Sequence, residues 1–130
     1  MSMIFITGGA AQGKRTFARE KLGINVFSDG AAAQYEELFG AVCITDYQLL
    51  VRRLMNEGTD PAAFTERLCA EGKLSAVIMN EVGCGIVPIE KDERLWRENC
   101  GRCGCILAEK ADAVIRMVCG IPTVIKGELP

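Results

Sequence analysis

A glycine-rich stretch near the N-terminus ends in a lysine and has the spacing of a phosphate-binding loop. Gly8, Gly13 and Lys14 occupy the fixed positions of the pattern G-x-x-x-x-G-K. Glycines let main-chain N–H groups close around phosphate oxygens, and the start of a following helix adds unsatisfied donors and its dipole. The alternative is a glycine turn that binds no ligand. The residues predicted to bind nucleotide phosphates are Gly8, Gly9, Ala10, Ala11, Gln12, Gly13, Lys14, Arg15 and Thr16.

One position of this loop departs from the pattern. The residue after Lys14 is normally Ser or Thr, whose hydroxyl binds Mg²⁺. This chain has Arg15 there, and its hydroxyl comes one place later, at Thr16. Because consecutive helical residues point about 100° apart, Thr16 is not a simple substitute. We predict Mg²⁺ with ATP or GTP as the cofactors, and Thr16 and Glu81 as the candidate metal ligands.

Acidic residues that follow predicted strands are candidates for catalysis. Phosphoryl transfer needs a carboxylate for Mg²⁺ or for the acceptor hydroxyl, and Asp29, Asp46 and Glu81 stand at suitable places. Asp29 also suits a turn, and Asp46 also suits a helix N-cap. We predict Lys14, Glu81 and Asp46 as catalytic residues. Asn80 is predicted to hold a phosphate oxygen or to order a water.

The chain contains no histidine. That absence excludes a histidine general base, a Ser–His or Cys–His nucleophile pair, and every histidine metal ligand.

Three cysteines lie close together at Cys100, Cys103 and Cys105, with Cys84 as the nearest candidate for a fourth metal ligand. A closed zinc site needs four ligands, usually as two separated pairs. Cys100 and Cys103 also fall on the apolar stripe of a predicted helix. We therefore favour buried free thiols over a zinc or iron–sulfur site.

Length and composition indicate an ordinary globular domain. With 130 residues, 49% hydrophobic and 25% charged, the chain is predicted to form a single nucleotide-binding domain over residues 1–130. Its net charge of −2 implies no general attraction to nucleic acid or to an anionic membrane. We expect no membrane span and no signal peptide. Seven cysteines without an evident need for disulfides favour a cytoplasmic location.

Short apolar runs alternate with amphipathic segments along most of the chain. This alternation predicts a three-layer α/β fold with a mainly parallel sheet and a C-terminal antiparallel hairpin. The long helix carries an apolar stripe made by Trp96, Cys100, Cys103, Leu107 and Ala111. The predicted strands are 3–6, 24–27, 41–45, 75–79, 113–118 and 123–126, and the predicted helices are 16–22, 31–39, 47–57, 61–71 and 92–111.

Ligands of such folds bind beyond the carboxyl ends of the parallel strands. We therefore expect four loops to line one site. These loops are Gly8–Lys14, Ser28-Asp29, Thr45-Asp46 and Asn80–Pro88.

Two blocks of sequence resemble a known family. The first is I-T-G-G-A-x-x-G-K, from Ile6 to Lys14, and the second begins with N-E-V-G-x-G-I-V-P, from Asn80 to Pro88. The second block continues through Arg94, Trp96, Arg97, Glu98, Gly101 and Arg102, then Ala111, Asp112 and Val114, then Gly120, Ile121 and Pro122. In this order the blocks resemble the bifunctional adenosylcobinamide kinase/adenosylcobinamide-phosphate guanylyltransferase family of cobalamin biosynthesis. The resemblance covers about 60 of the residues, and 17 to 77 match poorly.

The resemblance implies a RecA-like P-loop NTPase fold, a nucleotide and a corrinoid substrate, and a homo-oligomer, often a trimer. Family members phosphorylate adenosylcobinamide and then transfer GMP to that phosphate through a guanylylated histidine. The match around Glu81 ranks this residue above Asp46 and Asp29. Arg94, Arg97 and Arg102 could bind phosphates or form a solvated helix face.

The departures from the family shape the functional prediction. The chain lacks the histidine of the guanylyl transfer, has Arg15 in place of the loop serine, and has Gly104-Cys105 in place of an Asn-Gln pair. We predict a short form that phosphorylates adenosylcobinamide with ATP or GTP and has lost guanylyl transfer. The alternative is a catalytically silent nucleotide- or corrinoid-binding protein.

Overall fold

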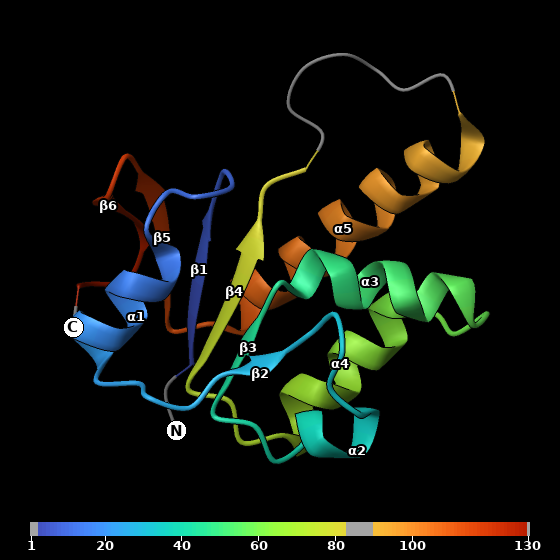
Figure 1. Cartoon of the computed structure of the whole chain (residues 1–130), viewed down its shortest axis with the longest axis horizontal. Coiled ribbons are helices and arrows are strands. Elements are labelled where there is room, and N and C mark those ends of the chain that lie inside the picture. The colour runs from blue at the N-terminus through green and yellow to red at the C-terminus, as the bar shows by residue number, and fades with distance from the viewer. Residues whose placement is uncertain (1–2, 83–89, 130) are drawn as a thin grey trace.

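One sheet organises the computed structural model, which describes residues 3–82 and 90–129. Within these residues six strands lie in the order β2-β3-β4-β1-β5-β6 (Figure 1). Their bounds are β1 Ile4–Gly8, β2 Ser28–Asp29, β3 Cys43–Thr45, β4 Ala76–Asn80, β5 Ala113–Val118 and β6 Ile121–Lys126.

The sheet is parallel except at one edge. β1 pairs in parallel with both β4 and β5, and β3 joins β2 to β4, also in parallel. β6 alone runs antiparallel, as a hairpin with β5. The mainly parallel sheet and its C-terminal hairpin confirm the prediction from the sequence. The carboxyl ends of β1, β3 and β4 consequently meet at one edge of the sheet.

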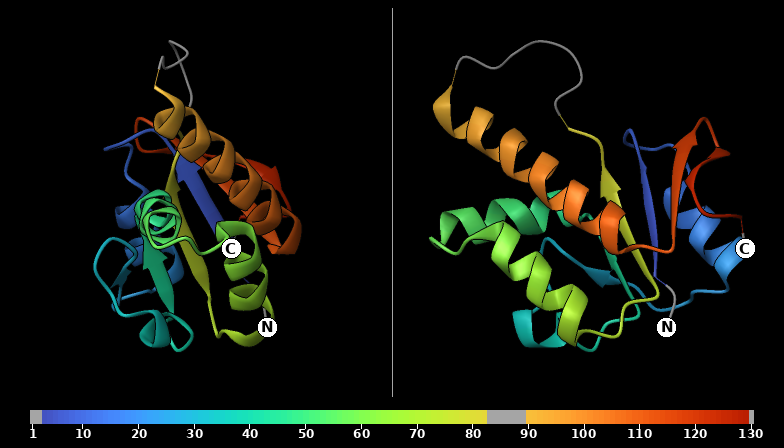
Figure 2. Two further views of the ribbon diagram at one scale, coloured as in Figure 1. Left: turned by 90° about the vertical axis from the view of Figure 1, so that its right-hand side faces the viewer. Right: turned by 180° about the vertical axis from the view of Figure 1, so that it is seen from behind.

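Helices cover both faces of the sheet (Figure 2). One face packs against α1, and the other packs against α3, α4 and α5. The helices are α1 Lys14–Leu22, α2 Tyr35–Leu38, α3 Tyr47–Asn56, α4 Pro61–Glu71 and α5 Lys91–Lys110.

The alternation of side chains along the central strands divides the core in two. On β1, Phe5 packs with the three-helix face while its neighbour Ile6 packs with α1. Val77 and Ile78 divide in the same way on β4. Both strands are buried on both faces, which is why they appear in the sequence as continuous apolar runs.

The predicted helix boundaries agree best with the structure where a capping side chain or a glycine determines them. Asp60 caps α4 by accepting a hydrogen bond from the Ala62 N–H at 3.1 Å, and Pro61 occupies the first helical position. Gly23 ends α1 in the left-handed conformation. The apolar stripe of α5 is also confirmed, because Cys100, Cys103 and Leu107 are all buried.

Two predictions between residues 24 and 39 are wrong. Residues 24–27 form no strand, and Ser28 and Asp29, predicted as a turn, pair instead with Ile44 and Thr45 of β3. The predicted helix 31–39 is reduced to the four residues of α2. The side chain of Asp29 accepts a hydrogen bond from the Ala31 N–H at 2.9 Å, and this local turn competes with helix formation.

The two adjacent leucines of α3 provide a matched test of the core. Leu50 is fully buried, whereas Leu49 is 38% exposed. Leu50→Ala should lower the free energy of unfolding by about 2–5 kcal/mol, because it leaves a cavity. Leu49→Ala should lower it by less than ~1 kcal/mol. Urea denaturation of the two variants checks this, and equal losses would contradict the described orientation of α3.

Candidate phosphate site

The turn from β1 into α1 is made possible by two glycines. Gly8 has a φ of +143°, and a Cβ placed on it would lie 2.4 Å from the Met117 carbonyl oxygen of β5. Gly13, at the N-cap of α1, has a φ of +88°. Side-chain-bearing residues rarely adopt either conformation. The loop is therefore a tight glycine turn, as the spacing predicts, and the structure shows that it lies against β5.

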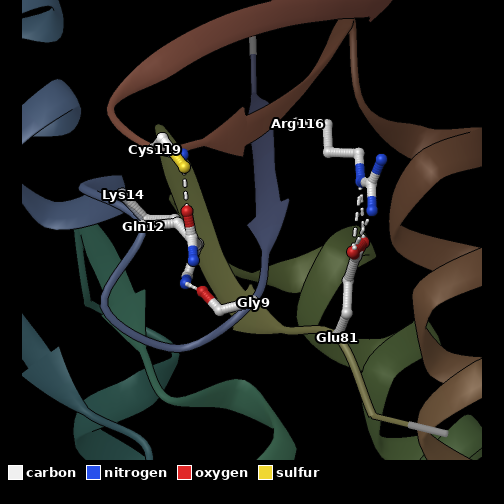
Figure 3. Close-up of polar contacts among 6 residues, drawn as sticks. All are labelled: Gly9, Gln12, Lys14, Glu81, Arg116 and Cys119. Carbon is white, nitrogen blue, oxygen red and sulfur yellow. Dashed lines mark hydrogen bonds and ion pairs between the residues drawn. The ribbon is translucent and has the colours of Figure 1, made fainter. Parts of the chain in front are cut away.

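Lys14 is the buried cation of this loop. It is only 6% exposed, and its ammonium donates a hydrogen bond to the Gly9 carbonyl (Figure 3). Burial lowers the pKa of the Lys14 ammonium below its usual range, while the carboxylates of Asp46 and Glu81 oppose that shift. The ammonium thus lies inside the loop, where it can meet an anion.

The β5–β6 turn holds the loop from the other side. The Gln12 side-chain oxygen accepts a hydrogen bond from the Cys119 N–H (Figure 3). The Gln12 main-chain oxygen accepts a second one from the Gly120 N–H at 3.1 Å. Gln12 was predicted only as a member of the loop, and its clamping role was missed. The sequence gives no local signal for a contact between residues so far apart.

A cavity of about 270 Å³ opens beside the loop at the carboxyl edge of the sheet. It brings together most of the predicted phosphate-binding residues with the end of β3 and with β4. Its lining residues are Ala11, Gln12, Gly13, Lys14, Arg15, Thr16, Thr45, Asp46, Ile78 and Asn80. We call it the phosphate cavity.

A buried glutamine joins the two predicted polar residues of this cavity. Gln48 on α3 donates through Nε2 to Asp46 Oδ1 at 3.3 Å, and its Oε1 accepts from the Asn80 N–H at 2.9 Å. Trp96 Nε1 donates a hydrogen bond to the main-chain oxygen of Gln48 at 2.8 Å, and this bond connects α5 to the start of α3. Gln48 was not predicted, because its partner Asn80 lies 32 residues away and its burial is visible only in the structure.

Asp46 lies where the sequence predicts it, between β3 and α3, but its side chain does not cap the helix. It stands at the N-cap of α3 with a φ of +51°, and its side chain makes no capping hydrogen bond. Its contact with Gln48 instead keeps it at the phosphate cavity.

Arg15 reaches across the phosphate cavity to the end of β3. One guanidinium nitrogen donates to Thr45 Oγ1 at 3.3 Å. The guanidinium carbon also lies 5.3 Å from the centre of the Phe27 ring, which is the geometry of a cation–π contact. The guanidinium is therefore held at the cavity by two separate contacts.

Glu81 lies at a different cavity. Its carboxylate pairs with the Arg116 guanidinium through three hydrogen bonds of 3.0–3.1 Å (Figure 3). It lines a space of about 310 Å³ on the α5 face, which we call the α5 cavity. Asn80 lines both cavities. The other lining residues of the α5 cavity are Phe5, Thr7, Met79, Val82, Cys100, Gly101 and Gly104.

The expectation that four loops line one site is met in part. The Gly8–Lys14 loop, Thr45-Asp46 and Asn80 meet at the phosphate cavity. Ser28-Asp29 is not among its lining residues, and residues 83–88 of the last loop lie outside the described residues. Arg94, Arg97 and Arg102 on α5 are likewise not among the described residues that line either cavity.

The cysteine cluster divides between the core and the surface. Cys100 and Cys103 are buried, whereas Cys105 is exposed and Cys84 lies outside the described residues. Burial raises the pKa of the Cys100 thiol to about 12. Among the described residues, no group of three or more His, Cys, Asp or Glu side chains is placed to hold a metal ion.

The described residues do not bring the two predicted magnesium ligands together. Thr16 and Glu81, the two predicted ligands, line different cavities. Asp46 is the single acidic side chain among the described residues that line the phosphate cavity, and Arg15 holds a positive charge beside it. Magnesium in nucleotide sites is bound by one or two carboxylates together with substrate phosphates, so Asp46 is the one carboxylate that the described lining residues offer it, and the neighbouring guanidinium repels the ion.

The comparison with known families matches most of the chain. A sequence model of the family described as cobinamide kinase / cobinamide phosphate guanyltransferase matches residues 41–125. The chain belongs to this family. The suspected resemblance is thereby confirmed. No curated protein matches the chain.

The cobinamide kinase / cobinamide phosphate guanyltransferase match includes Asp46, Asn80 and Glu81 but begins after the Gly8–Thr16 loop. The family is one of enzymes that transfer phosphoryl and nucleotidyl groups, and its description implies nucleotide and cobinamide substrates. None of the helices in the described part of the chain has the length and apolar character needed to cross a bilayer.

The lowered pKa of Lys14 predicts how anion binding depends on pH. As the pH rises through that pKa, at a value below 10.5, the ammonium becomes a neutral amine. The affinity for ATP should then fall by ~10-fold or more, because a charged hydrogen bond is lost. Calorimetry between neutral and alkaline pH measures this. Lys14→Ala should bind weakly throughout and show no such fall. A wild-type affinity that stays level up to pH 10.5 would contradict the described environment of Lys14.

Proposed function

We propose that residues 1–130 form a P-loop nucleotide-binding domain that phosphorylates adenosylcobinamide with ATP or GTP. The observation that carries this proposal is the buried Lys14 ammonium, which lies in a glycine loop at a cavity that also contains Asp46. The position of the loop after the central strand β1, with strand order β2-β3-β4-β1-β5, supports a RecA-like P-loop fold. Family membership supports the choice of acceptor.

The two cavities suggest how donor and acceptor are arranged. The phosphate cavity, at about 270 Å³, suits the phosphate groups of a nucleotide and leaves the nucleoside outside. The α5 cavity is less polar and adjoins it at Asn80, so we assign the acceptor side chain to it. Glu81, held by Arg116, would bind the polar end of that acceptor.

In this arrangement catalysis depends on positioning and charge. Lys14 would leave the Gly9 carbonyl to bind the β and γ phosphates. Asp46, fixed by Gln48, would accept the proton of the acceptor hydroxyl as its oxygen attacks the γ phosphorus. The bond from the γ phosphorus to the bridging oxygen breaks, and the nucleoside diphosphate leaves.

Guanylyl transfer is not part of the proposed activity. The chain has no histidine to carry GMP. All six lysines lie in the described part of the chain, and Lys21, Lys73, Lys91, Lys110 and Lys126 are exposed. An exposed lysine lacks the desolvated surroundings that make a lysine amine nucleophilic in enzymes.

The second candidate function is a catalytically silent protein that binds nucleotide or corrinoid. Arg15 and the missing histidine favour it, because both depart from the family pattern. The resemblance also leads us to propose a homo-oligomer, with a trimer as the form that the family suggests. The seven cysteines together with the phosphate loop lead us to propose a cytoplasmic location.

A turnover assay separates these functions. Wild-type protein with adenosylcobinamide and ATP or GTP should form adenosylcobinamide phosphate and a nucleoside diphosphate, detected by chromatography and mass spectrometry. Lys14→Ala should reduce the rate by at least ~10²-fold, because charge stabilisation is lost. Lys21→Ala, an exposed lysine on the same helix, is the control and should retain the rate. Nucleotide binding without turnover would favour the silent protein.

The same samples test for a covalent nucleotide. Incubation with α-labelled GTP followed by a denaturing gel should give no labelled protein band. A band that is stable to base, labile to acid and abolished by one lysine substitution would show that a lysine carries GMP. That result would contradict the proposed loss of guanylyl transfer.

A further inference from the structure

Arg15 stands where phosphate loops of this pattern place the hydroxyl that binds magnesium. Although its side chain is exposed, the guanidinium does not extend freely into solvent. It lies against Thr45 and Phe27, and Arg15 lines the same cavity as Lys14. A cation is therefore built into the part of the loop where a metal ion would otherwise bind.

The charges around the phosphate cavity favour a free polyphosphate. Among the described residues that line it, Lys14 and Arg15 are cationic and Asp46 is the single carboxylate. Glu81, the other predicted ligand, is paired with Arg116 and lines the α5 cavity. The lining thus carries a net positive charge, which attracts phosphate and repels a divalent cation.

We propose that this cavity binds the phosphates of a nucleoside di- or triphosphate without a divalent metal, and that the Arg15 guanidinium supplies the positive charge that Mg²⁺ supplies in other phosphate loops. This inference rests on the proposed nucleotide binding. A guanidinium can bind two phosphate oxygens at once through its planar donors.

The contacts that hold Arg15 allow it to change partner. The hydrogen bond to the Thr45 hydroxyl is long, at 3.3 Å, and the Phe27 ring contact involves no hydrogen bond. A phosphate oxygen is a charged acceptor and competes well with a neutral hydroxyl. We infer that Arg15 exchanges Thr45 for phosphate and keeps Phe27 as its support.

Calorimetry with ATP and GTP, in EDTA and in MgCl₂, tests the inference on the full chain. Wild-type protein should bind in EDTA, with an affinity within ~3-fold of that in MgCl₂ or tighter. Arg15→Ser should lose at least ~10-fold in EDTA, because a charged hydrogen-bond donor is removed, and should regain affinity when MgCl₂ is added. Arg15→Lys, which retains the charge, should lose less than Arg15→Ser in EDTA.

Arg19 offers a matched control on the same helix. Its guanidinium carbon lies 5.9 Å from the centre of the same Phe27 ring, but Arg19 does not line the phosphate cavity. Arg19→Ser should therefore bind nucleotide like wild type in both buffers. Circular dichroism of each variant checks that the fold is retained.

The outcomes distinguish this inference from the proposed function. Wild-type binding that requires MgCl₂ would overturn metal-free binding and leave nucleotide binding intact. Equal affinity of wild type and Arg15→Ser in EDTA would overturn the role of Arg15. Absence of binding in both buffers would overturn the proposed nucleotide site together with the inference. The comparison of wild type in the two buffers decides the first point even if a variant fails to fold.

Discussion

The carboxyl edge of this sheet depends on one tight connection, the turn from β1 into α1. Gly8 lies so close to the Met117 carbonyl of β5 that a Cβ would approach it to 2.4 Å, and Gly13 begins α1 with a positive φ. This path buries the Lys14 ammonium inside the loop. Burying that charge costs free energy through desolvation. The hydrogen bond to the Gly9 carbonyl offsets part of this free energy, and a bound anion would offset more of it.

Around this turn, the two faces of the sheet are joined by a short polar chain. Asp46, Gln48 and Asn80 are linked by hydrogen bonds, and Trp96 of α5 bonds to the Gln48 main chain. The phosphate cavity lies on the α1 side and the α5 cavity on the other, with Asn80 in both linings. A group transferred between the two cavities would therefore cross the sheet at the end of β4, where Asn80 lies.

The sequence predicted the parts of this arrangement that local pattern determines. The glycine loop, the capped start of α4, the apolar stripe of α5 and the β5–β6 hairpin follow from spacing and turn residues over a few positions. The two-residue strand β2 was missed because its pairing with β3 depends on a distant partner. Gln12 with Cys119, Gln48 with Asn80, and Glu81 with Arg116 were missed for the same reason. The role of Arg15 became interpretable only once its contact with Thr45 was known.

A crystal structure with a non-hydrolysable ATP analogue, grown in EDTA, tests the central claim most directly. The account predicts that the terminal phosphates lie in the phosphate cavity, against the main chain of the loop, with the Lys14 ammonium moved from the Gly9 carbonyl to a phosphate oxygen. It also predicts the Arg15 guanidinium on phosphate rather than on Thr45. Phosphates bound elsewhere on the chain, with Lys14 still bonded to Gly9, would contradict the account.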